Sequence, residues 1–330
     1  MVGAILVYDD RIISEGFHQQ YGGPHAEVNC LQNIPANQRQ LIEKSTLFVS
    51  LEPCAHYGKT PPCTDLIISK GIRDVVIGCR DINEQVNGKG IEKLEKAGIR
   101  VKSGILEKEA EALNRRFFTF HRHKRPYIIL KWAQSKDHKI AAFSEEDKGM
   151  KDSKRIFISN ALTNQLVHKW RSEEAAILVG TRTALNDNPA LTNRLWIGSD
   201  PLRVVIDLEL KLPASLQLLD GNVKTLVFNG IKQKEIGQVV YIKTDENIDL
   251  PRQILTTLFN RGISSLIIEG GAKLLQSFID RELWDEARVI TNLELTIGEG
   301  IEAPVLNRSN IAREESLYSD RICYYFNEST

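Results

Sequence analysis

Four residues in the first part of the chain have the chemistry of a metal-assisted hydrolase. His25 and Glu27 lie two residues apart, and two cysteines follow: Cys54, directly after Pro53, and Cys63. One imidazole and two thiolates leave the fourth position of a tetrahedral zinc ion open, which is the arrangement of catalytic zinc. A water molecule bound there becomes acidic near neutral pH. The pattern therefore predicts zinc-dependent deamination, with Glu27 transferring protons beside the three metal ligands.

Two features of this pattern leave other interpretations open. Eight residues separate Cys54 from Cys63, whereas the general deaminase pattern has two between its cysteines. Residues two apart do not share a helix face, so spacing alone does not bring His25 and Glu27 to one metal ion. The alternatives are a helix-start histidine beside two buried cysteines, and a structural zinc site, although no fourth Cys or His ligand is evident nearby. The other cysteines lie in apolar patterns and are expected in the core: Cys30, Cys79 and Cys323.

A glycine turn in the second half could approach a phosphate group. Residues 267–274 have the pattern of a strand, then Gly270-Gly271, then a helix, and glycine lets backbone N–H groups at a helix start reach a phosphate. Such turns often serve packing only, so this pattern is weak evidence by itself. No Gly-x-Gly-x-x-Gly follows a strand, which argues against a Rossmann dinucleotide fold.

The elements that must position these residues alternate between strands and helices. In the first 110 residues, strands are expected at 2–7, 46–51, 75–78 and 100–104, and helices at 25–31, 62–71 and 90–96. In the second half, buried strands are expected at 127–130, 176–179, 203–206, 225–228 and 265–268. This alternation predicts a layered α/β domain in each half. Residues 144–149 are expected to form an exposed loop.

Length and charge restrict the classes of function. A chain of 330 residues suits two domains. Lys plus Arg equals Asp plus Glu, at 43 each, and this balance disfavours binding to nucleic acid, which needs excess Lys and Arg. No run of eighteen apolar residues and no signal-peptide pattern occur, so a cytoplasmic protein without a membrane partner is expected. The five cysteines are odd in number and widely spread, which argues against a disulfide framework.

Two stretches around the predicted metal ligands closely resemble the riboflavin-biosynthesis deaminase/reductase family. These are residues 24–28, Pro-His-Ala-Glu-Val, and residues 51–63, Leu-Glu-Pro-Cys-Ala-His-Tyr-Gly-Lys-Thr-Pro-Pro-Cys. In that family the eight-residue gap is the rule, and generic cytidine deaminases lack the His-x-Gly-Lys-Thr-Pro-Pro insertion. The resemblance implies that zinc is bound by three residues and that one carboxylate carries protons: His25, Cys54 and Cys63, with Glu27.

The loop between Cys54 and Cys63 contains two residues that could contact a phosphate group. The family's substrate is a diaminopyrimidinone ribosyl phosphate, so the resemblance implies a phosphate near His56 and Lys59. A compact ammonium group is a good partner for phosphate, although a solvated loop lysine is the other interpretation of Lys59. Residues 81–83 and 86–90 resemble a further family segment that helps to close this pocket.

The resemblance continues from Pro126 to about Gly298. Matching stretches lie at 130–135, 167–171, 178–183, 187–192, 201–207 and 269–271. The resemblance implies an NADPH site lined by Ala133, Phe157, Thr183, Asp187, Gly271, Ala272, Lys273, Leu274 and Leu275. It implies that the phosphorylated pyrimidine substrate is held by Arg171, Leu191, Arg194 and Glu269.

Several of these residues also have plainer interpretations. The planar guanidinium groups of Arg171 and Arg194 suit bidentate binding of phosphate, but Arg171 could equally be a residue of a helix surface. Lys131 could neighbour the centre of hydride transfer, and a strand lysine with its amine in solvent explains it almost as well.

Taken over the chain, the resemblance implies an α/β fold with two domains. A cytidine-deaminase-like three-layer domain is expected over residues 1–121, and a dihydrofolate-reductase-like domain over 126–330, with a polar linker at 120–126. The implied function is bifunctional: hydrolytic deamination with zinc, then reduction of the ribosyl side chain to ribityl with NADPH. Assembly into a homo-oligomer through the reductase domain is expected by the same resemblance.

The chain departs from the family pattern at three places. Family members usually have a helix before the position of Met1, and without that helix one face of the first sheet is expected to be exposed. His138 replaces a turn glycine, at a cost if that position has positive φ. Phe157 replaces a tryptophan and can still stack on nicotinamide or ribose, without the indole N–H.

Two other hypotheses follow from the sequence. The first departure motivates a monofunctional reductase with an inactive deaminase domain. A nucleic-acid deaminase would need a basic groove and stacking aromatic residues, and neither occurs near His25 or Cys54.

Overall fold

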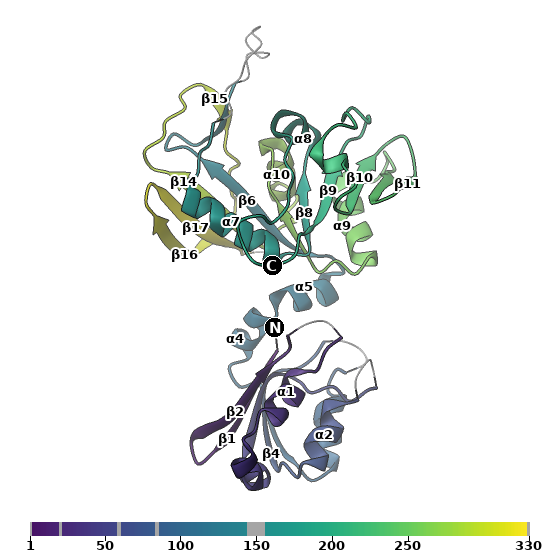
Figure 1. Cartoon of the computed structure of the whole chain (residues 1–330), viewed down its shortest axis with the longest axis vertical. Coiled ribbons are helices and arrows are strands. Elements are labelled where there is room, and N and C mark those ends of the chain that lie inside the picture. Colours follow the sequence, from purple (N-terminus) through teal and green to yellow (C-terminus); the bar gives the residue numbers. More distant parts are fainter. Residues whose placement is uncertain (1, 20–21, 58–60, 83–85, 144–155, 329–330) are drawn as a thin grey trace. The chain divides into compact units, whose positions relative to one another are not determined.

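The chain divides into two units, Met1–His123 and Lys124–Thr330, in the computed structural model. The structure describes residues 2–19, 22–57, 61–82, 86–143 and 156–328 (Figure 1). Lys59 and the loop expected at 144–149 lie outside these ranges. Part of the segment expected to be a linker is helical, because helix α5 (Arg115–His123) continues to the end of the first unit.

The sheet of the first unit has five strands in the order β2-β1-β3-β4-β5. Their bounds are β1 Gly3–Tyr8, β2 Arg11–Phe17, β3 Thr46–Leu51, β4 Asp74–Cys79 and β5 Arg100–Ser103. Strands β3, β4 and β5 are parallel, whereas β1 is antiparallel to both of its neighbours. The sequence did not predict β2. The Asp9-Asp10 turn that creates it has positive φ at both residues, as a two-residue hairpin turn requires.

Helices cover one face of this sheet. They are α1 (Ala26–Gln32), α2 (Cys63–Ser69) and α3 (Lys89–Lys96), and their apolar residues form one core with the strands. A close approach fixes α1, because a Cβ on Gly16 of β2 would lie 2.1 Å from the Cys30 nitrogen. Towards the other face, α4 (Glu107–Leu113) and α5 contribute to a small cluster around Cys79. Phe48 of β3 is 36% exposed.

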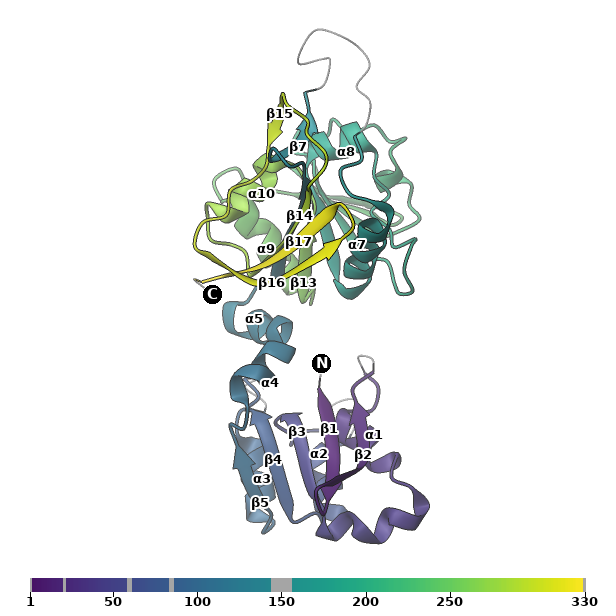
Figure 2. The same cartoon turned by 90° about the vertical axis from the view of Figure 1, so that its left-hand side faces the viewer.

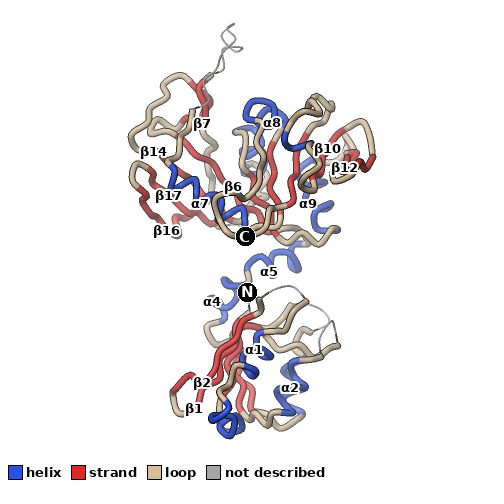
Figure 3. Tube along the Cα trace, viewed as in Figure 1, coloured by secondary structure: helices blue, strands red, loops and turns tan. Residues whose placement is uncertain are grey.

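The sheet of the second unit has ten strands in the order β11-β12-β10-β9-β8-β13-β6-β14-β17-β16 (Figure 3). The parallel strands are β12 (Val239–Lys243), β10 (Thr225–Asn229), β9 (Leu202–Ile206), β8 (Ala176–Val179), β13 (Ser265–Ile268), β6 (Tyr127–Gln134) and β14 (Glu286–Asn292). Antiparallel strands close the edges: β11 (Lys234–Ile236), β17 (Asp320–Asn327) and β16 (Ser309–Leu317). All five strands that the sequence predicted belong to the parallel part.

Helices cover both faces of this parallel part (Figure 2). Residues of α9 (Leu250–Asn260) and α10 (Ala272–Ile279) pack in one core, and residues of α7 (Ala161–Glu173) and α8 (Thr181–Asp187) pack in the other. Consecutive residues of β6 therefore face different cores, Ile128 one and Ile129 the other. Burial on both faces explains the uninterrupted apolar runs of these strands.

A two-stranded ribbon, β7 (Lys139–Ala142) with β15 (Gly300–Glu302), stands apart from the large sheet. The Asp137 carboxylate anchors its base, because it accepts the N–H groups of Ile297 at 3.1 Å and Gly298 at 2.7 Å. His138 has a φ of 58°, so the position does require the left-handed conformation that the replaced glycine would adopt freely. Its Nδ1 lies 2.9 Å from the Gln134 amide nitrogen.

We expect the free energy of unfolding to decrease from glycine through histidine to valine at position 138. His138→Gly removes strain but also the contact with Gln134, so its free energy of unfolding should stay within about 1 kcal/mol of wild type. His138→Val places a β-branched residue at positive φ and should cost about 1–2 kcal/mol. Thermal denaturation of the three proteins measures the order, and a valine variant as stable as the glycine variant would contradict it.

No helix among the described residues is long and apolar enough to cross a membrane.

Candidate functional sites

The three predicted metal ligands meet at one point of the first unit. Nδ1 of His25 lies 3.5 Å from Sγ of Cys54 and 3.3 Å from Sγ of Cys63, and all three donor atoms lie within 4.8 Å of one another. Tetrahedral zinc with ordinary bond lengths would place its nitrogen and sulfur ligands about 3.6 Å apart. The donor set and its spacing therefore fit a zinc ion.

Local structure explains how His25 and Glu27 can serve one site. His25 precedes α1 in an extended conformation, with φ −71° and ψ 166°, and Glu27 lies in the first turn. The rule about helix faces therefore does not apply to this pair. Glu27 is 3% exposed, and burial raises the pKa of its carboxyl group. Such a carboxyl group is suited to taking and releasing a proton.

The two cysteines are held by the start of α2. The N–H of Cys63 donates to Sγ of Cys54 at 3.3 Å, and Thr64 donates to the Cys54 carbonyl from both its N–H and its hydroxyl group. A hydrogen bond from Cys63 lowers the pKa of Cys54 to about 4, although burial opposes this, and the same bond raises the pKa of Cys63. Cys54 is thus a thiolate at neutral pH, the form that binds metal.

Two further residues lie near the metal ligands in the sequence: His56 in the inserted loop and Glu52 directly after β3. His56 is partly buried, and its Nδ1 has no hydrogen-bond partner among the residues that the structure describes. Glu52, which the sequence did not single out, is 4% exposed and accepts backbone N–H groups from the segment that follows β4. The Leu-Glu-Pro-Cys stretch was the only signal that could have drawn attention to it.

The second unit has a cavity of about 1900 Å³ near the carboxyl ends of its parallel strands. In open α/β sheets this is the edge where ligands bind. All of the predicted cofactor and substrate residues of this half line the cavity: Ala133, Phe157, Thr183, Asp187, Gly271, Ala272, Lys273, Leu274, Leu275, Arg171, Leu191, Arg194 and Glu269. The structure thus brings these residues together, and their individual roles stay predictions.

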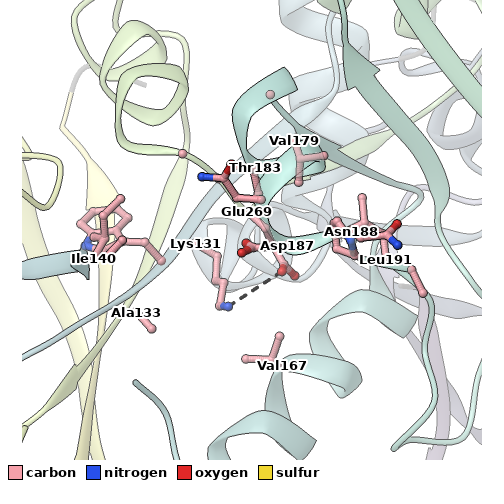
Figure 4. A pocket seen from close by; sticks show the side chains of 18 of the residues that line it. Lys131, Ala133, Ile140, Val167, Val179, Thr183, Asp187, Asn188, Leu191 and Glu269 are labelled. Atoms are coloured by element: carbon pink, nitrogen blue, oxygen red, sulfur yellow. Dashed lines mark ion pairs between the residues drawn. The ribbon is translucent and has the colours of Figure 1, made fainter. Parts of the chain in front are cut away.

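A buried charged cluster lines this cavity, and Figure 4 shows the ion pair between two of its members, Lys131 and Glu269. The Glu269 carboxylate accepts from Arg171 Nε at 2.8 Å and Nη2 at 2.6 Å, and Nζ of Lys131 lies 3.8 Å from it. Burial alone would raise the pKa of Glu269, but Arg171 and Lys131 outweigh it and hold the pKa at about 2. Burial lowers the pKa of Lys131. Lys131 is therefore not a lysine with its amine in solvent, since its side chain is only 13% exposed.

The sequence did not single out His168, which joins this cluster to the loop that carries Arg194. Nδ1 of His168 accepts the Arg194 N–H at 2.9 Å. Burial, with Arg171 and Arg194 nearby, lowers the pKa of His168 to about 4, so the ring is neutral at physiological pH. Nη1 of Arg194 also donates to the Thr192 hydroxyl at 2.8 Å. These contacts fix the backbone at Arg194 and leave its guanidinium at the exposed part of the cavity wall.

The glycine turn and its neighbours form another part of the wall. Gly271 precedes α10, and a Cβ on Gly270 would lie 3.1 Å from the Thr183 side chain, so Thr183 leaves little room for anything but glycine. Asp187 is the last residue of α8 and lines the same cavity. Phe157 is 76% exposed and lines the same cavity. The space and the close backbone therefore fit a dinucleotide cofactor such as NADPH.

Comparison with family models and known proteins covers both units. Residues 1–79 match the cytidine and deoxycytidylate deaminase zinc-binding region, and residues 126–301 match the RibD C-terminal domain. The riboflavin biosynthesis protein RibD of Aquifex aeolicus is 38% identical over 96% of this chain and 86% of its own length.

Solved structures give the same result. A diaminohydroxyphosphoribosylaminopyrimidine deaminase/5-amino-6-(5-phosphoribosylamino)uracil reductase from Thermotoga maritima aligns with a TM-score of 0.85 and 36% identity, over 99% of this chain and 91% of that one. RibD of Acinetobacter baumannii aligns with a TM-score of 0.84 and 30% identity, over 98% and 91%. These similarities confirm the predicted fold class.

Proposed function

Because this chain belongs to the RibD family of riboflavin-biosynthesis enzymes, we propose that its two units act in turn on one phosphorylated pyrimidine. The chain is a bifunctional enzyme, a zinc-dependent deaminase followed by an NADPH-dependent reductase. The proposed substrate is 2,5-diamino-6-ribosylamino-4(3H)-pyrimidinone 5′-phosphate, in keeping with the name of the Thermotoga relative. The observation that carries the proposal is that one chain holds both the His25, Cys54 and Cys63 cluster and a large cavity around Glu269.

In the deaminase unit, Glu27 is assigned the proton transfers. When bound, zinc acidifies a water molecule so that it can attack near neutral pH. The Glu27 carboxylate takes a proton from the attacking water and returns it to the amino nitrogen, which leaves as ammonia while a carbonyl replaces the amine. His56 and Lys59 are assigned to the substrate phosphate, and the assignment is supported by the Nδ1 of His56, which has no hydrogen-bond partner within the described part of the chain.

In the reductase unit, the charged cluster is assigned to the ribosyl group. When bound, NADPH supplies a hydride to the anomeric carbon of the ring-opened ribose, and one proton must be added as well. Lys131 is placed to supply that proton, since burial lowers its pKa and Glu269 keeps it beside the cavity. Arg194 and Leu191 are assigned to the substrate, together with Arg171 and Glu269, whose mutual pairing gives them fixed positions.

The cofactor is assigned to other residues that line the same cavity. The residues concerned are Ala133, Phe157, Thr183, Asp187 and the turn 271–275. Gly270 and Gly271 line the cavity directly before α10, which supports a site in which backbone N–H groups face the cofactor phosphates.

A comparison of the ribosyl substrate with and without its 5′-phosphate tests the proposed substrate. We expect ammonia release from the ribosyl substrate without its phosphate to have a kcat/KM at least about 10-fold lower, because a charge-assisted hydrogen bond contributes about 1.5–3 kcal/mol. Cytidine should not be deaminated. Equal kcat/KM values with and without phosphate, or efficient deamination of cytidine, would contradict the proposed substrate.

A reductase with a disabled partner unit is not favoured. The zinc ligands and Glu27 all converge in the first unit, and the full-length relatives carry both domains.

A cytoplasmic location and assembly into a homo-oligomer through the reductase unit complete the proposal. Five cysteines without disulfides support the location. Light scattering on the purified chain tests the assembly, and a monomeric mass would exclude it.

A further inference from the structure

Glu52 is a buried carboxylate that accepts four backbone N–H groups from the described residues that follow β4. Its Oε2 accepts from Asp81 at 3.2 Å and Gly88 at 3.0 Å, and its Oε1 accepts from Gly90 at 2.9 Å and Ile91 at 3.2 Å. A carboxylate that is 4% exposed needs such donors, because burying an unpaired charge is costly. Four charge-assisted hydrogen bonds use most of its capacity as an acceptor.

The segment that Glu52 holds lies beside the metal ligands. Leu51 pairs with Cys79 in the parallel register of β3 and β4, and the Glu52 N–H donates to the Cys79 carbonyl at 3.0 Å. The residues that follow both strands therefore emerge at the same edge of the sheet. A Cβ on Gly90 would lie 2.1 Å from the carbonyl oxygen of Pro53, which precedes Cys54. The described residues 81–82 and 86–91, here called the wall segment, are thus packed against the chain at the metal centre.

Glu52 does not hold the metal ligand itself. Thr64 fixes the Cys54 carbonyl, and the Cys63 N–H fixes the Cys54 sulfur. Loss of the Glu52 carboxylate would therefore release the wall segment and leave the zinc ligands in place.

From this geometry we infer that Glu52 is a positioning residue, which holds the wall segment as one side of the deaminase substrate site. This role rests on the proposed deaminase function of the same site. Because its carboxylate oxygens bond to backbone N–H groups, Glu52 acts on the affinity for the pyrimidine substrate through the backbone of the wall segment. Its effect should appear mainly in KM, whereas the chemistry at Glu27 should be preserved.

Glu52→Gln in the full chain tests this role, because the amide group turns a donor toward two backbone N–H groups. We expect KM for the diaminopyrimidinone ribosyl phosphate to rise at least about 10-fold, from the loss of two charge-assisted bonds. The kcat for ammonia release should change less than about threefold, and one zinc per chain should be retained. Glu52→Asp keeps the charge and should show a smaller rise in KM. Glu92→Gln, at an exposed ion pair with Lys96, is the control and should match wild type.

Hydrogen exchange of the backbone amides distinguishes local release of the wall segment from a wider loss of structure. In Glu52→Gln, the amides of the wall segment should lose protection while those of β3 and β4 keep theirs. Unchanged KM and unchanged exchange would overturn the inference, and so would loss of zinc or loss of protection throughout β3 and β4. If wild type does not deaminate this substrate, the proposed function fails, and the exchange result still decides whether Glu52 holds the wall segment.

Discussion

Glutamine in place of Glu27 is expected to lower the rate of ammonia release by about 10²–10⁴-fold, the usual contribution of a positioned acid–base group. The side chain keeps its size but can no longer take a proton from the attacking water. His25, Cys54 and Cys63 are unchanged, so one zinc per chain should still bind. Ammonia release by Glu27→Gln, measured with zinc-replete protein, gives the effect.

The second unit provides an internal control for this variant. NADPH oxidation with the already deaminated substrate should equal that of wild type, because no residue of the cavity has changed. Glu92→Gln removes an exposed carboxylate of the first unit and should leave both activities unchanged. Wild-type ammonia release by Glu27→Gln would remove Glu27 from the mechanism.

Glutamine in place of Glu269 should have the largest effect in the second unit, on both stability and reduction. It leaves Arg171 and Lys131 buried without their negative partner, and breaking a buried ion pair in this way costs about 3–5 kcal/mol. For a domain of this size that corresponds to a fall in Tm of about 10 °C. Reduction of the deaminated substrate should be lost, whereas ammonia release by the first unit should continue.

The pKa of Glu269 in this cluster determines how the stability of the second unit changes with pH. The pKa of Glu269 is held at about 2, below the ordinary 4.5. Its stabilisation is therefore fully present above pH 4.5 and is lost as the pH falls towards 2. In Glu269→Gln this part of the acid dependence should disappear. The control is Glu282→Gln at the exposed pair with Arg308, which should cost less than about 1 kcal/mol. Equal Tm values for both variants would show that the cluster is not a stabilising one.

Sequence patterns could predict the strands that are buried on both faces. In β8, β10 and β13 every residue is buried, and each strand contains at least three consecutive apolar residues. Strand β16, by contrast, is exposed along most of its length, and its residues Arg313, Glu314 and Glu315 give no strand signal. The pairing of β16 with β17 depends on contacts between residues that periodicity does not relate.

The residues of the candidate sites also divide into those that a sequence pattern could identify and those that it could not. Residue type drew attention to His25, Cys54 and Cys63, because metal ligands are chemically distinctive, and the resemblance of residues 24–28 and 51–63 to the family accounted for their irregular spacing. Glu52 and His168 could not be found in this manner, since each acts through backbone groups distant in sequence. The close pairing of Arg171 with Glu269, 98 residues apart, likewise depends on the tertiary fold.

The most direct test of bifunctionality is ammonia release from freshly made diaminopyrimidinone ribosyl phosphate, with and without NADPH, using zinc-replete protein. We expect ammonia in both cases, and NADPH oxidation only after ammonia has been released. No ammonia, with NADPH oxidised only when the deaminated compound is supplied, would contradict the assignment of the first unit as an active deaminase.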